Sequence, residues 1–270
     1  MRTRSAVHSV HSRRTRIPAM LASLSALALA LSGCDYINDT ITSSGDEDSV
    51  STGHPQDSAT VDQDNDYFVV TGTAKREYQV QPGEISYCDL DEMERATCAY
   101  GELTYDTRAD AQARGRSEEE LPDPAGWPDH NSEVDIPALT GVEGSKSYHG
   151  WMFNRSHLIA DSLGGEPEAV NLVTGTRTQN VGSHQKKGQY AGGMAHTELL
   201  ARDYLDNAVA QSCPLYYAVT PHYESAELIP RTVTVDIQSC DKSIDERIEV
   251  SNSAQGWAID YTTGEYSPAS

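Results

Sequence analysis

Residues 153–180 decide the fold, and they read FNRSHLIADSLGGEPEAVNLVTGTRTQN. Within this stretch His157 follows Arg155 by two residues and stands at the end of a predicted strand. A Gly-containing loop over 171–180 comes next, and then a helix that carries Glu198. One histidine among nine proves little, because most histidines are surface or core residues. These neighbours single out His157 as the candidate general base.

The rest of the folded part is predicted to be one α+β domain of roughly 200 residues, which is enough for a substantial core. Alternating apolar residues predict strands and apolar residues at helical spacing predict helices. The predicted strands are 67–70, 78–80, 148–153, 215–219, 232–237 and 257–261. The predicted helices are 106–120, which is expected to be exposed, and 194–210. Turns or loops are expected at 81–83, 122–127 and 163–167.

The N-terminal 33 residues have the composition of a secretory signal. Residues 1–16 hold five Arg and no acid, and the apolar run 17–32 is shorter than the roughly 20 residues that a membrane span needs. The run closes on Leu31-Ser32-Gly33-Cys34, which resembles a bacterial lipobox, so Cys34 is expected to carry lipid. An ordinary signal peptide with a chance cysteine is the alternative. The predicted organisation is a signal peptide at 1–33, a disordered, lipid-attached tether at 34–66 and a catalytic domain at 67–270.

The charge of the chain is strongly acidic. Removing 1–33 takes away five Arg and no acid, so the formal net charge goes from −21 to −26. Such acidity argues against a polyanionic partner. However, the window from Lys146 to Arg202 holds six Lys and Arg against four acids, and this is where the candidate site lies.

The cysteines favour disulfides in an exported protein. With Cys34 reserved for lipid, four remain, and three pairings are possible. The local pairs Cys88–Cys98 and Cys213–Cys240 are preferred. Zinc binding is the competing interpretation, but the spacing contains no C-x-x-C motif.

Several separated motifs give the chain a family resemblance. Residues 153–180, with Gly193-Met194 and Glu198, resemble the DNA/RNA non-specific endonucleases of the DNA-entry nuclease type, which belong to the ββα-metal (His-Me finger) superfamily. Further matches lie at 124–127, 217–221 and 259–264, so the resemblance covers most of 86–265. It implies a ββα-metal core with a surrounding antiparallel sheet.

The resemblance assigns a role to each matching position. His157 matches the general base, Arg155 the arginine of an Asp-Arg-Gly-His signature, and Asn180 the side-chain ligand of one divalent metal. Glu198 matches an acid on the helix beside the metal. The metal is expected to be Mg²⁺, with Mn²⁺ as a substitute, because a hard ion keeps its waters and needs few protein ligands. The expected products have 5′-phosphate and 3′-hydroxyl ends.

The sequence departs from the family pattern in two places. Asn154 and Ser156 replace the Asp and the Gly of the signature. In addition, the stretch between Asn180 and Met194 is longer than in the pattern, which weakens the placement of the acid on the helix.

Three basic residues near the motif are expected to hold the phosphate backbone: Arg177, Lys186 and Lys187. Simpler explanations compete with each assignment. Arg155 could instead form a structural ion pair, and Asn180 could instead cap the following helix. Glu198 could be an ordinary exposed helix residue, and the two lysines could belong to a solvated loop. Three further histidines remain unassigned: His149, His184 and His196. Asn171 and Thr174 are expected to shape the predicted 171–180 loop rather than to react.

Two classes of function follow. The first is an extracellular, membrane-anchored nuclease that hydrolyses DNA, with RNA as a second substrate and little sequence preference. A nuclease directed against competing cells shares this chemistry. The second class is a surface lipoprotein that binds nucleic acid or a protein partner without cleaving it.

Overall fold

The computed structural model describes residues 66–115 and 120–270. Cys34, the predicted signal peptide and nearly all of the predicted tether lie outside these residues. Within the described part, no helix has both the length and the apolar character that crossing a membrane requires.

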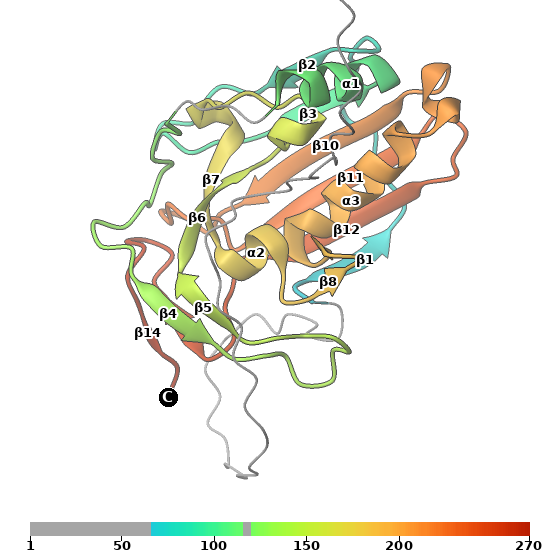
Figure 1. Ribbon diagram of the computed structural model, residues 1–270. Coiled ribbons are helices and arrows are strands. Elements are labelled where there is room, and N and C mark those ends of the chain that lie inside the picture. Colours follow the sequence, from blue (N-terminus) through green and yellow to red (C-terminus); the bar gives the residue numbers. More distant parts are fainter. Residues whose placement is uncertain (1–65, 116–119) are drawn as a thin grey trace, which may run out of the picture. The chain divides into compact units, whose positions relative to one another are not determined.

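A six-stranded antiparallel sheet forms the centre of the domain (Figure 1). Its strands are, in spatial order, β1 (Phe68–Gly72), β12 (Asp245–Ser251), β11 (Thr232–Ser239), β10 (Leu215–His222), β3 (Ala99–Leu103) and β2 (Ile85–Tyr87). The longest pairing joins β10 to β11 over eight residue pairs, from Leu215–Ser239 to His222–Thr232.

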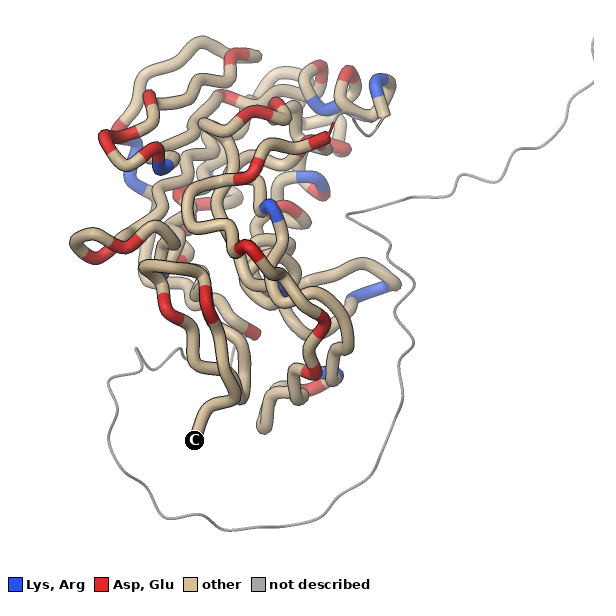
Figure 2. The backbone as a smooth tube through the Cα atoms, turned by 90° about the vertical axis from the view of Figure 1, so that its left-hand side faces the viewer, with Lys and Arg blue, Asp and Glu red and all other residues tan. Residues whose placement is uncertain are grey.

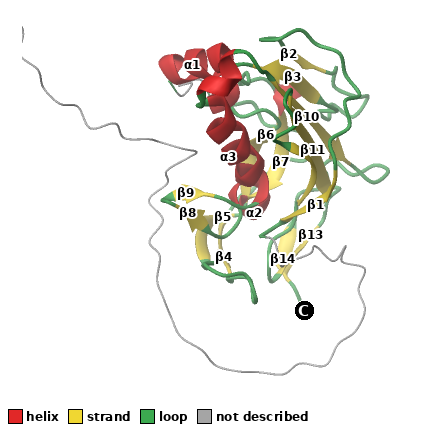
Figure 3. Cartoon of the chain, turned by 90° about the vertical axis from the view of Figure 1, so that its right-hand side faces the viewer, coloured by secondary structure: helices red, strands yellow, loops and turns green. Residues whose placement is uncertain are grey.

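The core lies between this sheet and helix α3 (Gly193–Leu205). Successive side chains of a strand point to opposite faces, so every second residue of β11 enters the core: Val233, Val235 and Ile237 are fully buried. Figure 3 shows α3 lying alongside the sheet, and its apolar residues join the same cluster. Burial of these side chains is the main stabilising contribution of the domain.

Helix α1 (Tyr105–Arg114) begins at a capping box in which Thr104 and Thr107 satisfy each other's backbone N–H groups. It ends before Gly115, so it covers only the first part of the predicted 106–120 helix. It is also less exposed than predicted, because Arg108 is buried and binds Asp206.

The predicted strand 148–153 is in fact parts of two strands. β5 (Tyr148–Trp151) pairs with β4 (Glu133–Ile136), and β6 (Phe153–His157) pairs with β7 (Leu172–Thr176). The chain changes partner at Met152, whose N–H donates to Ser132 and whose carbonyl accepts from Arg177. The loop predicted over 171–180 was wrong, since it contains β7 and the short helix α2 (Arg177–Val181).

Smaller elements complete the fold. β4, β5, β13 (Trp257–Ile259) and β14 (Tyr266–Pro268) surround a second apolar cluster. A two-residue turn joins β8 (Gln185–Lys186) to β9 (Gln189–Tyr190). Among the described residues, three 3-10 helices lie in the connections: η2 (Asp161–Leu163), η3 (Ala169–Asn171) and η4 (Ala208–Gln211).

Other predicted elements need smaller corrections. The strands predicted at 67–70, 215–219, 232–237 and 257–261 are confirmed, but β2, β3, β4, β12 and β14 were missed. Residues 78–80 do not form a strand: the Tyr78 N–H donates to the Tyr216 hydroxyl, and its ring stacks on Tyr100. Side chains rather than a β-ladder therefore hold that segment. The helix predicted over 194–210 ends at Leu205, and η4 follows.

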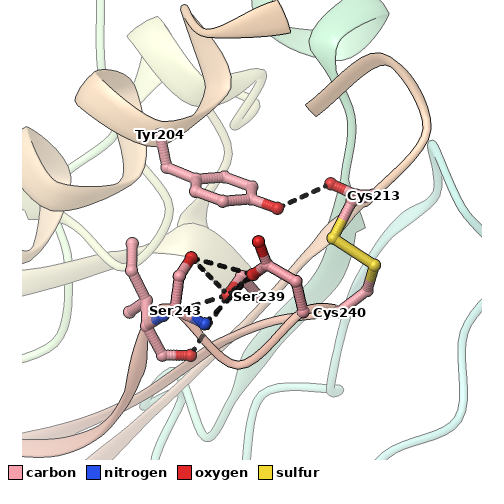
Figure 4. The surroundings of a disulfide bond; sticks show 7 residues. Tyr204, Cys213, Ser239, Cys240 and Ser243 are labelled. Carbon is pink, nitrogen blue, oxygen red and sulfur yellow. Dashed lines mark hydrogen bonds between the residues drawn. A yellow bond between two sulfur atoms is a disulfide. The ribbon is translucent and has the colours of Figure 1, made fainter. Parts of the chain in front are cut away.

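The preferred disulfides, Cys88–Cys98 and Cys213–Cys240, are both present. The four cysteines are therefore not zinc ligands. Figure 4 shows the second bridge, which joins the residues flanking β10 and β11, with the Tyr204 hydroxyl donating to the Cys213 carbonyl at 3.1 Å. It ties two central strands together at one end.

Candidate active site

Strands β6 and β7 and helix α2 form a compact ββα unit, as the resemblance implies. His157 is the last residue of β6 and lies opposite Leu172. β7 leads directly into α2 because Thr176 caps the helix, its hydroxyl accepting from the Gln179 N–H at 2.9 Å. The close approach of strand and helix requires Gly175, where an added Cβ would lie 2.2 Å from Gln179 Oε1.

Asn180 lies in α2 and contacts the strand that carries His157. The Ser156 hydroxyl donates to Asn180 Oδ1 at 3.2 Å, and Ser156 is fully buried. The candidate base thus directly follows the residue that touches the candidate metal ligand. The alternative that Asn180 caps the next helix is wrong, because Gly192 occupies the N-cap of α3.

A second amide oxygen lies near this contact. Asn154 is two residues from Ser156, which places both on the same side of β6. Its Oδ1 is buried and has no hydrogen-bond partner among the described residues. A buried acceptor without a partner is costly unless something else satisfies it. Nowhere in the described ranges do three or more His, Cys, Asp or Glu residues gather as a metal cluster. Asn180 Oδ1 and Asn154 Oδ1 are both neutral amide oxygens, a type of donor that suits a hard cation.

Arg155 is held by two residues of the 122–127 segment. Its Nε donates to Asp123 Oδ1 at 2.9 Å, and its guanidinium carbon lies 4.3 Å from the centre of the Trp127 ring. The structural ion pair considered for Arg155 is therefore present. Neither Asp123 nor Trp127 was assigned a role from the sequence, although Trp127 stood in one of the supporting motifs.

The loop after His157 is fixed by Asn171. Its Oδ1 accepts from the Ile159 N–H, and its Nδ2 donates to the Ile159 and Glu166 carbonyls, all at 2.9 Å. Thr174 similarly donates to the Ala125 carbonyl at 2.9 Å. Both residues thus hold neighbouring backbone in place, although the 171–180 segment that they were expected to shape is a strand and a helix rather than a loop.

Arg177, expected to bind phosphate, is 8% exposed. Its guanidinium carbon lies 4.7 Å from the centre of the Tyr148 ring and 4.5 Å from that of Tyr190. Such stacking stabilises a cation between aromatic faces. The side chain therefore joins β5, α2 and the β8–β9 hairpin.

Glu198 is buried on α3, so the alternative of an exposed helix residue is wrong. Its Oε2 lies 3.2 Å from Arg202 Nη1. The start of α3 packs closely on α2, since an added Cβ at Gly193 would lie 2.3 Å from the Gln179 carbonyl oxygen. The helix that bears Glu198 is thus in direct contact with the helix that bears Asn180.

The two candidate lysines lie on the insertion, which is a β-hairpin rather than a loop. Lys186 ends β8, and Lys187 and Gly188 form the turn with φ values of 52° and 79°. Both lysine side chains are exposed.

The two histidines near the hairpin have identified neighbours. His184 Nδ1 lies 2.6 Å from Asp66 Oδ2. His196 stacks on Phe68, and burial, aided by the nearby charges of His184 and Lys186, lowers its pKa to about 4. His196 is therefore neutral near pH 7.

Comparison with known proteins finds a matching family and a related deoxyribonuclease. A model described as DNA/RNA non-specific endonuclease matches residues 128–241. A protein named deoxyribonuclease from Streptococcus dysgalactiae subsp. equisimilis is 30% identical over 218 residues, which cover 73% of this chain and 64% of that protein. The chain thus spans somewhat less than two thirds of the length of that relative.

Solved structures agree with this match. The structure of the Sda1 nuclease with a bound zinc ion is 30% identical, has a TM-score of 0.66, and is matched over 78% of this chain and 100% of its own. The fold is also shared with NucA from Streptococcus agalactiae in its magnesium-bound form, at 22% identity and a TM-score of 0.54, over 73% and 84% of the two chains.

Proposed function

The chain belongs to the DNA/RNA non-specific endonuclease family, and from this we propose that its ββα unit hydrolyses phosphodiester bonds of DNA, and also of RNA, with the help of a divalent cation. One observation carries the proposal: the contact between Ser156 and Asn180 joins the strand end bearing His157 to the helix bearing a metal-type ligand. The same arrangement would serve non-specific cleavage, because it addresses the phosphate backbone rather than the bases.

The residues around Asn180 fit a divalent metal. Asn180 Oδ1 and the unpartnered Asn154 Oδ1 are oxygen donors of the kind that Mg²⁺ prefers. When bound, the cation would neutralise charge on the phosphate. The zinc and magnesium named for the two related structures support a divalent ion. We propose Mg²⁺, with Mn²⁺ as a substitute, because the donors are hard oxygens.

His157 would act as the general base. Its imidazole takes a proton from a water molecule as the water oxygen forms a bond to phosphorus. The bond from phosphorus to the 3′ oxygen breaks, and that oxygen takes up a proton from solvent. The products carry a 5′-phosphate and a 3′-hydroxyl.

The surrounding residues would position the substrate. Asp123 and Trp127 restrict the Arg155 side chain, so its remaining guanidinium donors can meet a phosphate with little loss of entropy. Glu198, held by Arg202, would orient water beside α2. The exposed Lys186 and Lys187 would contact the backbone of the nucleic acid, and Arg177 would act by holding α2 in place.

We further propose that the enzyme works outside the cell, attached to the membrane by lipid on Cys34. The basic and apolar N-terminal pattern supports export. The two disulfides support it as well, since such bonds persist in oxidising compartments.

A plasmid assay tests the function. The purified protein should nick and linearise supercoiled plasmid with Mg²⁺ or Mn²⁺, and EDTA should stop the reaction. His157→Ala should lower the rate about 10²–10⁴-fold, the usual contribution of a general base, with an unchanged circular dichroism spectrum.

His149→Ala is the matched control, because this histidine is exposed on β5 and pairs with Asp135. It should cleave like the wild type. Intact plasmid with every divalent metal, or full activity in His157→Ala, would overturn the proposal. A mobility shift without cleavage would instead support a protein that only binds nucleic acid.

A further inference from the structure

Asp66, where the predicted tether meets the domain, is almost completely buried at 1% exposure. Its carboxylate accepts four hydrogen bonds from two consecutive residues. Asp66 Oδ1 accepts from the Ser183 N–H at 2.7 Å and from the Ser183 hydroxyl. Asp66 Oδ2 accepts from the His184 N–H at 3.2 Å and lies 2.6 Å from His184 Nδ1. A buried charge of this kind is stable only because donors surround it.

Glycines shape the space around this carboxylate. An added Cβ would lie 2.4 Å from Asp66 Oδ2 at Gly182 and 1.7 Å from it at Gly192. Gly182 ends α2, and Gly192 is the N-cap of α3. The carboxylate therefore fits between the end of one helix and the start of the next, at the base of the β8–β9 hairpin.

The backbone of Asp66 joins the same contact. Its carbonyl accepts from the Gly193 N–H at 2.9 Å, which satisfies one of the free donors in the first turn of α3. No side chain caps that helix. Asp66 thus holds the beginning of α3 with its carbonyl and the chain leaving α2 with its carboxylate.

The next two residues continue this attachment. The Tyr67 hydroxyl accepts from the Gln255 N–H at 3.1 Å, and the Phe68 ring stacks on His196 of α3 with 3.7 Å between ring centres. Asp66 and Tyr67 have φ values of 57° and 69°, a left-handed conformation that an aspartate tolerates but that is unfavourable for the bulky Tyr67. The surrounding contacts hold the backbone in this strained form.

We propose that Asp66 is a positioning residue for the nuclease site. It fixes the end of α2 to the start of α3, and so sets Asn180 and Glu198 relative to each other. It also fixes the base of the hairpin that carries Lys186 and Lys187. The inference rests on the proposed function, because it assigns the α2–α3 spacing a role in cleavage.

Kinetics of Asp66→Ala in the full chain test this role. A small displacement of a site residue can cost up to about 100-fold in rate, so kcat should fall about 10- to 100-fold. The Mg²⁺ concentration for half-maximal activity should rise as well. Asp66→Asn keeps an oxygen acceptor for Ser183, so its kcat should lie between those of wild type and Asp66→Ala.

Asp91→Ala is the matched control. Asp91 also organises a loop, accepting from the Met93 N–H and from the N–H and Nε of Arg95, within the segment closed by the Cys88–Cys98 bridge. Its loss should lower the melting temperature but leave kcat and the metal requirement unchanged. A kcat of Asp66→Ala within twofold of wild type, or an equal loss of kcat in Asp91→Ala, would overturn the proposal.

Amide hydrogen exchange separates this inference from the proposed function. Asp66→Ala, or Asp66→Asn if the alanine variant does not fold, should exchange faster across 177–193, and Asp91→Ala should not. Unchanged exchange there overturns the positioning role whether or not the protein cleaves DNA. Inactive wild type with faster exchange would refute only the nuclease assignment and leave Asp66 as the residue that joins the helices.

Discussion

The central sheet and the ββα unit are both buried, but different forces hold them. The face of the sheet that packs against α3 buries mainly apolar residues, among them Val233, Val235 and Ile237 of β11, although alternate positions of that strand, such as Asp236 and Gln238, are polar. In the ββα unit the buried residues are largely polar, and they include Ser156, Thr174, Thr176, Thr178 and Gln179. Apolar burial stabilises without fixing direction, whereas hydrogen bonds fix where each group points. The sheet therefore supplies stability, and the ββα unit supplies geometry.

Asn252, at the end of β12, links the two regions. Its Nδ2 donates to the carbonyls of Thr174 and Pro230, and its Oδ1 accepts from the Thr176 N–H, at 2.7–2.9 Å. The next carbonyl, that of Ser253, accepts from the hydroxyls of Thr176 and Thr178. The rigid sheet thus holds β7 and the start of α2 through directional bonds.

The largest expected effect lies in the ββα unit. Asn180→Ala should lower cleavage at least about 100-fold, because losing even an indirect metal partner costs 10- to 100-fold. Stability should change little. Steady-state rates over a series of Mg²⁺ concentrations check this, and a higher metal concentration should recover part of the rate.

Ser156→Ala serves as the control for Asn180. It removes the hydrogen bond to Asn180 Oδ1 but keeps the oxygen itself, so its activity should fall much less. Equal losses in the two variants would mean that the hydrogen bond, rather than metal binding, explains the role of Asn180.

A change in the sheet should lower stability and leave the catalytic rate unchanged, the reverse of the effect expected for Asn180→Ala. Val235→Ala removes two buried carbons at a fully buried position and should lower the free energy of unfolding by about 2 kcal/mol. Urea denaturation measures this loss. The kcat of the folded variant should match wild type, and a large fall in kcat would show that the two regions are not separable in this way.

The same contrast explains what the sequence could predict. In the sheet, alternation predicted β1, β10 and β11, and helical spacing predicted α3, whereas the other three strands, β2, β3 and β12, were missed. The ββα unit has no such pattern: β7 is buried at every position and α2 has five residues. Only the family resemblance identified this unit, and it correctly indicated a strand pair followed by a helix.

The supporting contacts could not be predicted because they join distant parts of the chain. Asp123 is 32 residues from Arg155, and Asn252 is 76 residues from Thr176. Asp66 was placed in the tether because its neighbours in the sequence are polar, yet the fold buries it against residues 117 and 118 positions away. Single polar residues carry no periodic signal, so only the folded structure reveals such partners.

The smallest expected effect lies outside both regions, on the β8–β9 hairpin. Lys186→Ala and Lys187→Ala should each raise KM a few-fold with kcat unchanged, because exposed lysines contribute through the phosphate charge alone. Each lysine–phosphate contact should contribute about 1 to the slope of log KM against log salt concentration, so this slope should be smaller by about 2 in the double variant than in the wild type. Lys242→Ala, an exposed lysine paired with Asp245 between β11 and β12, is the control and should keep the wild-type slope. If the hairpin variants also keep that slope, the two lysines belong to a solvated surface, and binding of the phosphate backbone rests on the ββα unit itself.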